Sequence, residues 1–294
     1  MTKLNILLPL YNDWRSCNYL IKKINDQLSQ RKRYADILIL NDASTQKTNI
    51  NKKGIKNIGK IKVLTSNKNL GSQKIITLGL NFVKKEKNKI NIIMDSDGED
   101  DVLSLNNLID ICLQNSNYIA VAARVKRREN LIFRILYKSH LILTFLLTLK
   151  WISFGNYSCF YSKQISNILK NNESWLAFSS SVAKNCKLIK LDTDRQKRFF
   201  GKSKLSFYGL FNHAFRILAV FQKRVFLISS FYVFLLIIIY QLTYTSLFLG
   251  ICFFILIINF LIILTKNKTL KDINNIYFKE IKSNLFFYKE FLNF

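Results

Sequence analysis

The chain has 294 residues, of which 49% are hydrophobic and 14% aromatic, and its formal net charge is +27. This apolar content excludes a disordered chain, and one proline with nine glycines excludes a collagen-like or Pro/Gly low-complexity chain. The five cysteines are scattered without a Cys-x-x-Cys pair, so we expect no disulfide framework, no zinc site and a reducing compartment. The charge is consistent with nucleic acid, an anionic membrane surface or phosphorylated substrates, and also with a compositional bias toward lysine.

The first part of the chain alternates short apolar runs with segments of helical periodicity. Strands are predicted at residues 3–10, 35–40, 60–64, 90–94 and 118–123, and the first stops near Pro9. Helices are predicted between them at residues 14–30, 72–83 and 102–113. This alternation predicts an α/β fold with a mostly parallel sheet covered by helices on both faces. The apolar run at residues 4–10 is too short for the core of a signal peptide, and we expect none.

Polar clusters follow three of these predicted strands. They are Tyr11–Asp13, Asn41–Ser44 and Asp95–Asp97. Because parallel sheets bind ligands beyond the carboxyl ends of their strands, we expect the three clusters to converge on one site. Asp42 suits hydrogen bonding to a nucleoside, and it equally suits an ordinary turn. Asn69-Leu70-Gly71-Ser72 opens a helix, which a structural cap explains as well as a function does.

The stretch from Asp95 to Asp101 carries five carboxylates in seven residues. Such a cluster at a ligand-binding edge requires a cation, and oxygen ligands favour Mg²⁺ or Mn²⁺ over zinc. Mg²⁺ usually takes one or two carboxylates together with substrate phosphates, so a diphosphate-bearing substrate is expected. The spacing does not match an EF-hand, and the alternative interpretation is a solvated acidic turn.

A basic segment follows at residues 195–204. Its cations surround Gly201 and are Arg195, Lys197, Arg198, Lys202 and Lys204. Guanidinium and ammonium groups neutralise phosphate, although a charge run is more often a solvated face. Phe199 and Phe200 interrupt the run, which indicates a loop packed against the rest of the protein. Basic and aromatic residues also occur in single-strand nucleic-acid sites, but an acidic metal site on a membrane-anchored chain argues against nucleic acid as a partner.

The C-terminal third contains no charged residue between Val225 and Thr265. Two apolar runs, 225–242 and 246–264, approach the ~20 residues that cross a bilayer, so residues 225–264 are predicted to form a transmembrane hairpin. The alternative is a buried core hairpin. Basic residues flank the hairpin at both ends and are absent from its connecting turn, which places the preceding residues and both termini in the cytoplasm. The expected location is the cell (inner) membrane.

Three further segments combine apolar bulk with basic residues. Residues 131–154 are predicted to form helices lying in the membrane interface, or else an ordinary buried helix, and residues 205–224 a juxtamembrane amphipathic helix. The tail, residues 265–294, is expected to be amphipathic and cytoplasmic, docking on membrane lipids or on a second protomer. The catalytic domain is then residues 1–204.

The ordered set of motifs resembles membrane-anchored glycosyltransferase family 2 enzymes of the dolichyl-phosphate mannose synthase and bacterial polyprenyl-phosphate glycosyltransferase type. The matching stretches are Pro9-Leu10-Tyr11-Asn12-Asp13, Asn41-Asp42-Ala43-Ser44, Asn69-Leu70-Gly71, Met94-Asp95-Ser96-Asp97, Arg124 with Arg127 or Arg128, and Arg198-Phe199-Phe200-Gly201-Lys202-Ser203-Lys204. The resemblance implies a GT-A fold: a Rossmann-like, mostly parallel sheet forming a nucleotide-diphospho-sugar transferase domain, followed here by interfacial helices and the transmembrane hairpin.

The resemblance also implies roles for individual residues. Binding of the nucleotide sugar would fall to Pro9, Tyr11, Asp13, Asp42, Asp95 and Arg195. Mg²⁺ or Mn²⁺ would be held by Asp95, Asp97 and Glu99. Catalysis, chiefly stabilisation of the leaving diphosphate, would fall to Asp97, Arg198 and Lys204, and the lipid phosphate would face Arg124 and Arg134.

The chain departs from the family pattern in ways that bear on the acceptor. Gly155-Asn156-Tyr157-Ser158 stands where lipid-phosphate enzymes tend to have Gly-Asp-Phe or Gly-Asp-Tyr followed by Arg. The leading hypothesis is inverting sugar transfer to a polyprenyl phosphate, in cell-envelope synthesis. A second is transfer to a hydroxyl of a lipid-linked glycan, for which Asp100 or Asp101 would be the base. A third is a degenerate, non-enzymatic membrane scaffold.

Overall fold

A computed structural model describes residues 3–51, 53–126, 131–201, 207–271, 273 and 278–279. The chain divides into two compact units. The sheet unit comprises residues 1–129, 153–203 and 273–294, and the helical unit comprises residues 130–152 and 204–272. The segment 131–152, which lies between strands in the sequence, therefore groups with the C-terminal helices.

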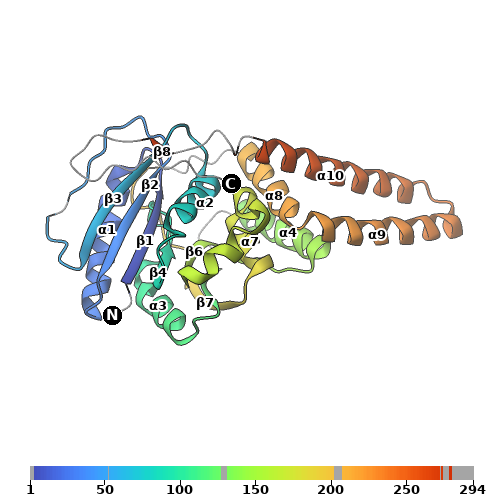
Figure 1. Cartoon of the computed structure of the whole chain (residues 1–294). Coiled ribbons are helices and arrows are strands. Elements are labelled where there is room, and N and C mark those ends of the chain that lie inside the picture. Colours follow the sequence, from blue (N-terminus) through green and yellow to red (C-terminus); the bar gives the residue numbers. More distant parts are fainter. Residues whose placement is uncertain are drawn as a thin grey trace. The chain divides into compact units, whose positions relative to one another are not determined.

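The sheet unit is built on an eight-stranded sheet in the order β7-β5-β6-β4-β1-β2-β3-β8. The strands are β1 (Lys3–Leu10), β2 (Ala35–Asn41), β3 (Ile58–Ser66), β4 (Lys89–Ile93), β5 (Ile119–Lys126), β6 (Phe154–Tyr161), β7 (Leu188–Asp194) and β8 (Phe278–Lys279). β6 runs antiparallel to both β4 and β5, and β8 runs antiparallel to β3, whereas the other pairs are parallel. The expected α/β fold with a mostly parallel sheet is confirmed (Figure 1).

Helices connect the strands. They are α1 (Trp14–Gln30), α2 (Ser72–Val83), the 3₁₀ turn η1 (Val102–Ser104), α3 (Leu105–Gln114), η2 (Ser162–Gln164), α5 (Ile165–Ile168), η3 (Lys170–Asn172), α6 (Glu173–Leu176) and α7 (Phe178–Asn185). The segment predicted as one helix at residues 102–113 is a 3₁₀ turn followed by α3. The Asp101 side chain begins the 3₁₀ turn by accepting a hydrogen bond from Leu103 N. Strands β6 and β7 and helices α5–α7 were not predicted.

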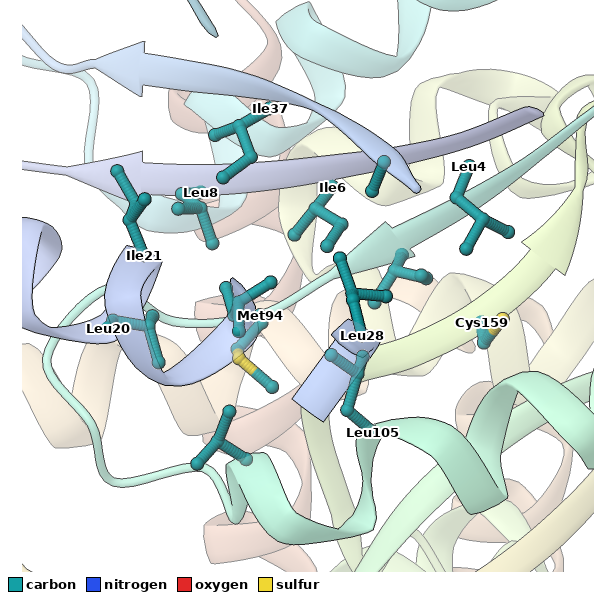
Figure 2. Close-up of a cluster of buried hydrophobic side chains, with 14 of the residues drawn as sticks. Leu4, Ile6, Leu8, Leu20, Ile21, Leu28, Ile37, Met94, Leu105 and Cys159 are labelled. Atoms are coloured by element: carbon teal, nitrogen blue, oxygen red, sulfur yellow. The ribbon is translucent and has the colours of Figure 1, made fainter. Parts of the chain in front are cut away.

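The core of this unit forms where α1 and α3 cover one face of the sheet. Leu4, Ile6 and Leu8 alternate along β1 toward this face, and Figure 2 shows them among Leu20 and Leu28 of α1. All five side chains are at most 5% exposed. Burying one such side chain contributes about 1.5–3 kcal/mol, so the period-two pattern of β1 and the helical pattern of α1 determine how the two pack.

The helical unit contains α4 (Leu131–Thr148), α8 (Phe207–Val220), α9 (Gln222–Thr243) and α10 (Leu247–Leu270). The helix expected to run from 131 to 154 ends earlier, at Thr148. The next residue, Leu149, adopts φ 53°, the Thr148 hydroxyl accepts a hydrogen bond from Lys150 N, and residue 154 begins β6. The segment predicted as one helix at 205–224 is divided at Phe221, which follows the end of α8 at Val220 and precedes the first residue of α9, Gln222.

Helices α9 and α10 are long and apolar enough to cross a membrane, with mean hydropathies of 2.3 and 3.1 over their most apolar stretches. Only 11% of each stretch is buried. Asn259 Nδ2 of α10 donates to Ser229 Oγ of α9 at 2.8 Å, and Lys266 Nζ donates to Gln222 Oε1 at 2.8 Å. The two helices are therefore joined by polar contacts within an otherwise apolar pair.

Helix α4 is attached to α9 through its C-terminal carbonyl groups. Arg224 donates to Thr148 O at 3.0 Å, and the Tyr232 hydroxyl donates to Leu146 O at 2.9 Å. Carbonyls in the last turn of a helix have no partner within it, so these two bonds satisfy α4 and fix it along the first turns of α9.

Candidate active site

The polar clusters predicted at strand ends do meet at the carboxyl edge of the sheet. β1 pairs with both β2 and β4 in parallel, so the loops after all three strands leave the same edge. Ser96 Oγ donates to Pro9 O at 2.7 Å, which ties the loop after β4 to the end of β1. Asn12 Oδ1 accepts from the backbone N–H groups of Thr45 and Gln46, which ties the loops after β1 and β2 together.

The acidic loop, residues 95–101, is closed by its own carboxylates. Asp100 Oδ2 accepts from Asp95 N at 2.9 Å, and Asp97 Oδ1 accepts from Glu99 N at 3.0 Å. Gly98 lies at the turn with φ +84°, and a Cβ there would stand 2.3 Å from the ring of Phe199. Both the backbone conformation and the close approach of the ring require glycine at this position.

Three arginines from outside the loop pair with these carboxylates. Arg198 Nη2 donates to Asp97 Oδ2 at 2.5 Å. Arg195 forms an ion pair with Glu99, and Arg124 Nη2 donates to Asp100 Oδ1 at 3.2 Å. The expected acid and base clusters are therefore in direct contact, and each arginine has its own principal carboxylate.

The basic segment is also held to the acidic loop by its backbone. Gln196 N donates to Glu99 O at 2.9 Å, and Phe199 N donates to Asp97 O at 3.0 Å. The Phe199 ring packs edge-on against Tyr19 of α1, with centroids 4.8 Å apart. The prediction that the interleaved phenylalanines pack this segment onto the protein is confirmed.

Burial and neighbouring carboxylates both raise pKa values in the acidic loop. Burial, with the neighbouring carboxylates of Asp100 and Asp97, raises the pKa of Asp95 to about 7. Burial and the nearby Glu99 raise the pKa of Asp97 as well, although Arg198 opposes this. A cation brought to these two carboxylates would favour their ionised forms, so the arrangement suits a positively charged ligand.

The remaining residues expected at the nucleotide sugar lie around this loop. Asp13 caps α1 by accepting from Ser16 N at 3.3 Å, and its other oxygen lies 3.4 Å from Arg198 Nη1. Tyr11 is 39% exposed at the end of β1. Asp42 is buried, and its two oxygens accept from Leu70 N at 2.7 Å and Gly71 N at 2.8 Å. In the structure Asp42 therefore holds the 69–71 turn, and its nucleoside contact stays a prediction.

Two of the expected side chains cannot be placed at this site. Lys204 lies outside the described residues. Arg134 belongs to α4, and its side chain lies outside the described part of the chain. Arg124 lies against Asp100, and a Cβ at Gly155 would stand 2.9 Å from its Nη2; its contact with a lipid phosphate stays a prediction.

Two buried amides of the site were not predicted to have a role. Asn156 on β6 donates from Nδ2 to Asp95 Oδ1 at 3.0 Å, and its Oδ1 accepts from Gln73 Nε2 at 3.0 Å. In the sequence, Asn156 is distinguished only as a departure from a family pattern. Gln73 belongs to no motif, because glutamine is common in the first turn of a helix.

Solved structures of other proteins resemble the fold of this chain. The most similar solved structures include mannosyl-3-phosphoglycerate synthase from Rubrobacter xylanophilus, 12% identical, with a TM-score of 0.51 over 76% of this chain and 74% of that one. They also include glucosyl-3-phosphoglycerate synthase from Mycobacterium tuberculosis with Mn²⁺, uridine diphosphate and glucosyl-3-phosphoglycerate, 13% identical, TM-score 0.44, over 76% and 80%. TarS residues 1–349 from S. aureus is 16% identical, TM-score 0.43, over 76% and 72%.

No curated protein matches the chain in sequence. The first of the solved structures supports the GT-A fold. The family model described as Glycosyl transferase family 2 matches residues 5–171, which is more than half of the chain and includes the acidic loop, Gln73 and Asn156. The chain therefore belongs to glycosyltransferase family 2 and is a glycosyltransferase.

Proposed function

We propose that this enzyme transfers a sugar from a nucleoside diphosphate sugar to a polyprenyl phosphate, with inversion and with a divalent metal, at the cytoplasmic face of the cell membrane. The observation that carries the proposal is the contact between the acidic loop and the arginines of residues 195–198. Carboxylates that suit a metal and guanidinium groups that suit a diphosphate meet at one edge of the sheet.

The residues present fit Mg²⁺ or Mn²⁺ completed by substrate. Within the described residues no group of three His, Cys, Asp or Glu side chains forms a ready ligand set. Asp95 and Asp97 are proposed as the two carboxylates for the ion, and Arg198 must leave Asp97 when the ion binds; Glu99, also expected as a ligand, is paired with Arg195. Two carboxylates plus phosphate oxygens are the usual protein site for Mg²⁺. When bound, the ion would neutralise charge on the departing diphosphate.

The chain's own cations would assist the same departure. The acceptor phosphate oxygen forms a bond to the anomeric carbon while the bond from that carbon to the diphosphate breaks, and a nucleoside diphosphate leaves. Arg198 and Arg195 would exchange their carboxylate partners for the diphosphate oxygens, which carry growing charge as the bond breaks. Lys204 is proposed to add a third cation. Positioning and charge stabilisation then carry the reaction, without an enzyme nucleophile.

The two side chains that could act as a general base, Asp100 and Asp101, bear on the identity of the acceptor. A phosphate is already anionic at neutral pH, whereas a sugar hydroxyl needs a general base. Asp100 is buried and accepts from both Arg124 and Asp95 N, and Asp101 accepts from Leu103 N as the cap of η1. Both candidate bases are engaged, which favours the phosphate. The departure at Asn156 is the observation that favours the alternative, a hydroxyl of a lipid-linked glycan.

Membrane attachment is proposed from the helical unit. At about 1.5 Å per residue, the 22 residues of α9 and the 24 of α10 each exceed the ~30 Å of a bilayer's hydrocarbon core. The side chains of Phe145, Leu149 and Trp151 at and beyond the end of α4 are 42–60% exposed, which suits contact with lipid. Lys223 and Lys268 flank the pair, so both ends are proposed to be cytoplasmic.

The test is a donor and acceptor screen on the full chain purified in detergent. It supplies Mn²⁺ or Mg²⁺, a panel of UDP- and GDP-sugars, and a short-chain polyprenyl phosphate. We expect release of nucleoside diphosphate together with a glycosylated lipid phosphate, and loss of both on addition of EDTA. Product formed only with a lipid-linked glycan would establish the alternative. A chain that binds no nucleotide sugar with Mn²⁺ would be the membrane scaffold, and the proposal would be wrong.

A further inference from the structure

A chain of three hydrogen bonds runs through buried amides to the acidic loop. Phe178 N, at the start of α7, donates to Gln73 Oε1 at 2.7 Å. Gln73 Nε2 donates to Asn156 Oδ1 at 3.0 Å, and Asn156 Nδ2 donates to Asp95 Oδ1 at 3.0 Å. Gln73 is 8% exposed and Asn156 is 7% exposed, so water has little access to this relay.

The direction of the relay is set at its far end. A side-chain amide can present either its oxygen or its nitrogen to a neighbour, but a backbone N–H can only donate. Phe178 N therefore requires the oxygen of Gln73, which turns the Gln73 nitrogen toward Asn156. Asn156 in turn must offer its nitrogen to Asp95. A backbone group on α7 thus determines that Asp95 meets a donor.

The consequence is a carboxylate held in one orientation. The relay engages Asp95 Oδ1, while among the described residues Asp95 Oδ2 accepts no hydrogen bond. Groups that hydrogen-bond to metal-binding side chains orient those side chains and tune the site. We propose that Gln73 is a positioning residue for sugar transfer: acting through Asn156, it holds the Asp95 carboxylate with one oxygen open to the divalent cation of the donor complex.

This inference rests on the proposed function, because it assumes that Asp95 receives a cation with the donor diphosphate. It adds a residue on α2. Among the described residues, the hydrogen bonds that link Gln73 to the acidic loop pass through Asn156, so substitution at 73 changes the direction of the relay without removing a proposed metal ligand.

The experiment reverses the relay. Gln73→Glu keeps the size of the side chain and still accepts from Phe178 N, but its ionised carboxylate presents an acceptor oxygen to Asn156 Oδ1; binding is therefore compared at rising pH, which ionises a buried carboxyl group. Asn156 must then turn its nitrogen to residue 73 and its oxygen to Asp95, which replaces a donor with a repelling acceptor. Gln164→Glu is the matched control: Gln164 is 7% exposed and donates from Nε2 to Asn117 O at 3.0 Å, away from the acidic loop.

The readout is the Mn²⁺-dependent binding of UDP and GDP to the full chain in detergent, measured by calorimetry beside the melting temperature. We expect Gln73→Glu to weaken this binding by about 10- to 100-fold. In the nucleoside diphosphate release assay, the apparent KM for Mn²⁺ should rise by a larger factor than kcat falls. Gln164→Glu is expected to lower the melting temperature comparably and to bind as the wild type does. Gln73→Met, which removes the hydrogen bonds without reversing them, is expected to weaken binding less.

The outcomes separate this inference from the function on which it rests. If the wild type binds and either Gln73 variant that folds retains its Mn²⁺-dependent affinity, the positioning role is wrong and the proposed function stands. If the wild type binds neither nucleotide with Mn²⁺, the proposed function fails and this inference fails with it. Weaker binding in the Gln73 variants, with the Gln164→Glu control unchanged, supports the positioning role and the metal-dependent donor binding on which it rests.

Discussion

Arg198 is expected to oppose metal binding in the free enzyme and to promote catalysis in the loaded one. Its guanidinium lies 2.5 Å from Asp97 and 3.4 Å from Asp13, with Nε 3.9 Å from Glu99. The Arg198 side chain is 20% exposed and that of Asp97 is 17% exposed. A divalent cation that binds Asp97 must displace the guanidinium, so the Arg198→Ala substitution separates the two effects.

The size of the effect follows from the burial of the pair. Unit charges about 4 Å apart interact by about 4 kcal/mol at an effective dielectric constant of about 20. Breaking a buried ion pair costs about 3–5 kcal/mol, whereas an exposed pair contributes about 0–1 kcal/mol. For side chains that are one-fifth exposed we expect about 2 kcal/mol. Since about 1.4 kcal/mol is a factor of ten, Arg198→Ala should bind Mn²⁺ roughly 10- to 30-fold more tightly without nucleotide.

The same variant should lose turnover. Removing one donor that stabilises developing charge typically costs about 10²- to 10³-fold in kcat. The assays are Mn²⁺ calorimetry without nucleotide and nucleoside diphosphate release with donor and acceptor. Arg15→Ala is the control. Arg15 stacks on Phe200 of the basic segment at 3.9 Å, so this substitution removes a cation that contacts the same segment while leaving the Arg198 ion pairs in place. Mn²⁺ binding by Arg198→Ala that is no tighter than the wild type would refute the reasoning.

Three further predictions test other parts of the structure. Gly98→Ala should lower kcat at least tenfold, because its Cβ would stand 2.3 Å from the Phe199 ring and displace it. Gly54→Ala is the control, since Gly54 has a similar φ of +81° but nothing within 4 Å of the added Cβ. It should cost about 1 kcal/mol of stability and leave kcat unchanged. Cys186, the one described cysteine that is partly exposed, should alkylate about tenfold faster per pH unit from pH 7 to 10 without levelling. The reason is that partial burial raises the pKa of its thiol to about 12 and only the thiolate reacts; a plateau near pH 9 would contradict this. Asn259→Leu should destabilise the helical unit by about 0.6–2 kcal/mol in detergent unfolding, because the 2.8 Å bond to Ser229 is lost, and an unchanged midpoint would show that this bond contributes nothing.

The elements that could be predicted are those with a simple pattern. β1 and α1 were placed correctly from residue 3 to residue 30, because a strand buried on both faces and a one-sided helix each have a clear period. β6 was missed although it lies inside the sheet. Its sequence mixes Gly155, Asn156 and Ser158 with aromatic residues, and those polar groups are satisfied by contacts that only the fold creates.

The candidate site also has features that could be predicted from the sequence and features that could not. The convergence of three strand-end clusters follows from the topology of a parallel sheet, which the alternation of elements predicts. The pairing of Arg195 with Glu99 and of Arg124 with Asp100 does not follow, because each pair joins residues 24 or more positions apart and the carboxylates lie in a loop of no regular period. Gln73 was out of reach for the same reason: its role depends on a backbone N–H 105 residues later in the chain.

The pairing of charges explains why the acidic loop and the basic segment belong to one site. Five carboxylates and three arginines form the network. They are Asp13, Asp95, Asp97, Glu99 and Asp100, with Arg124, Arg195 and Arg198. With all five carboxylates ionised the network carries two negative charges in excess, which is the charge that one divalent cation balances. A diphosphate arriving with that cation would offer the arginines new anionic partners in place of the loop carboxylates. Each arginine would therefore stay paired with a negative charge when the ligand binds. The carboxylates of the network are thus suited to a divalent cation, and its arginines to a diphosphate that arrives with that cation.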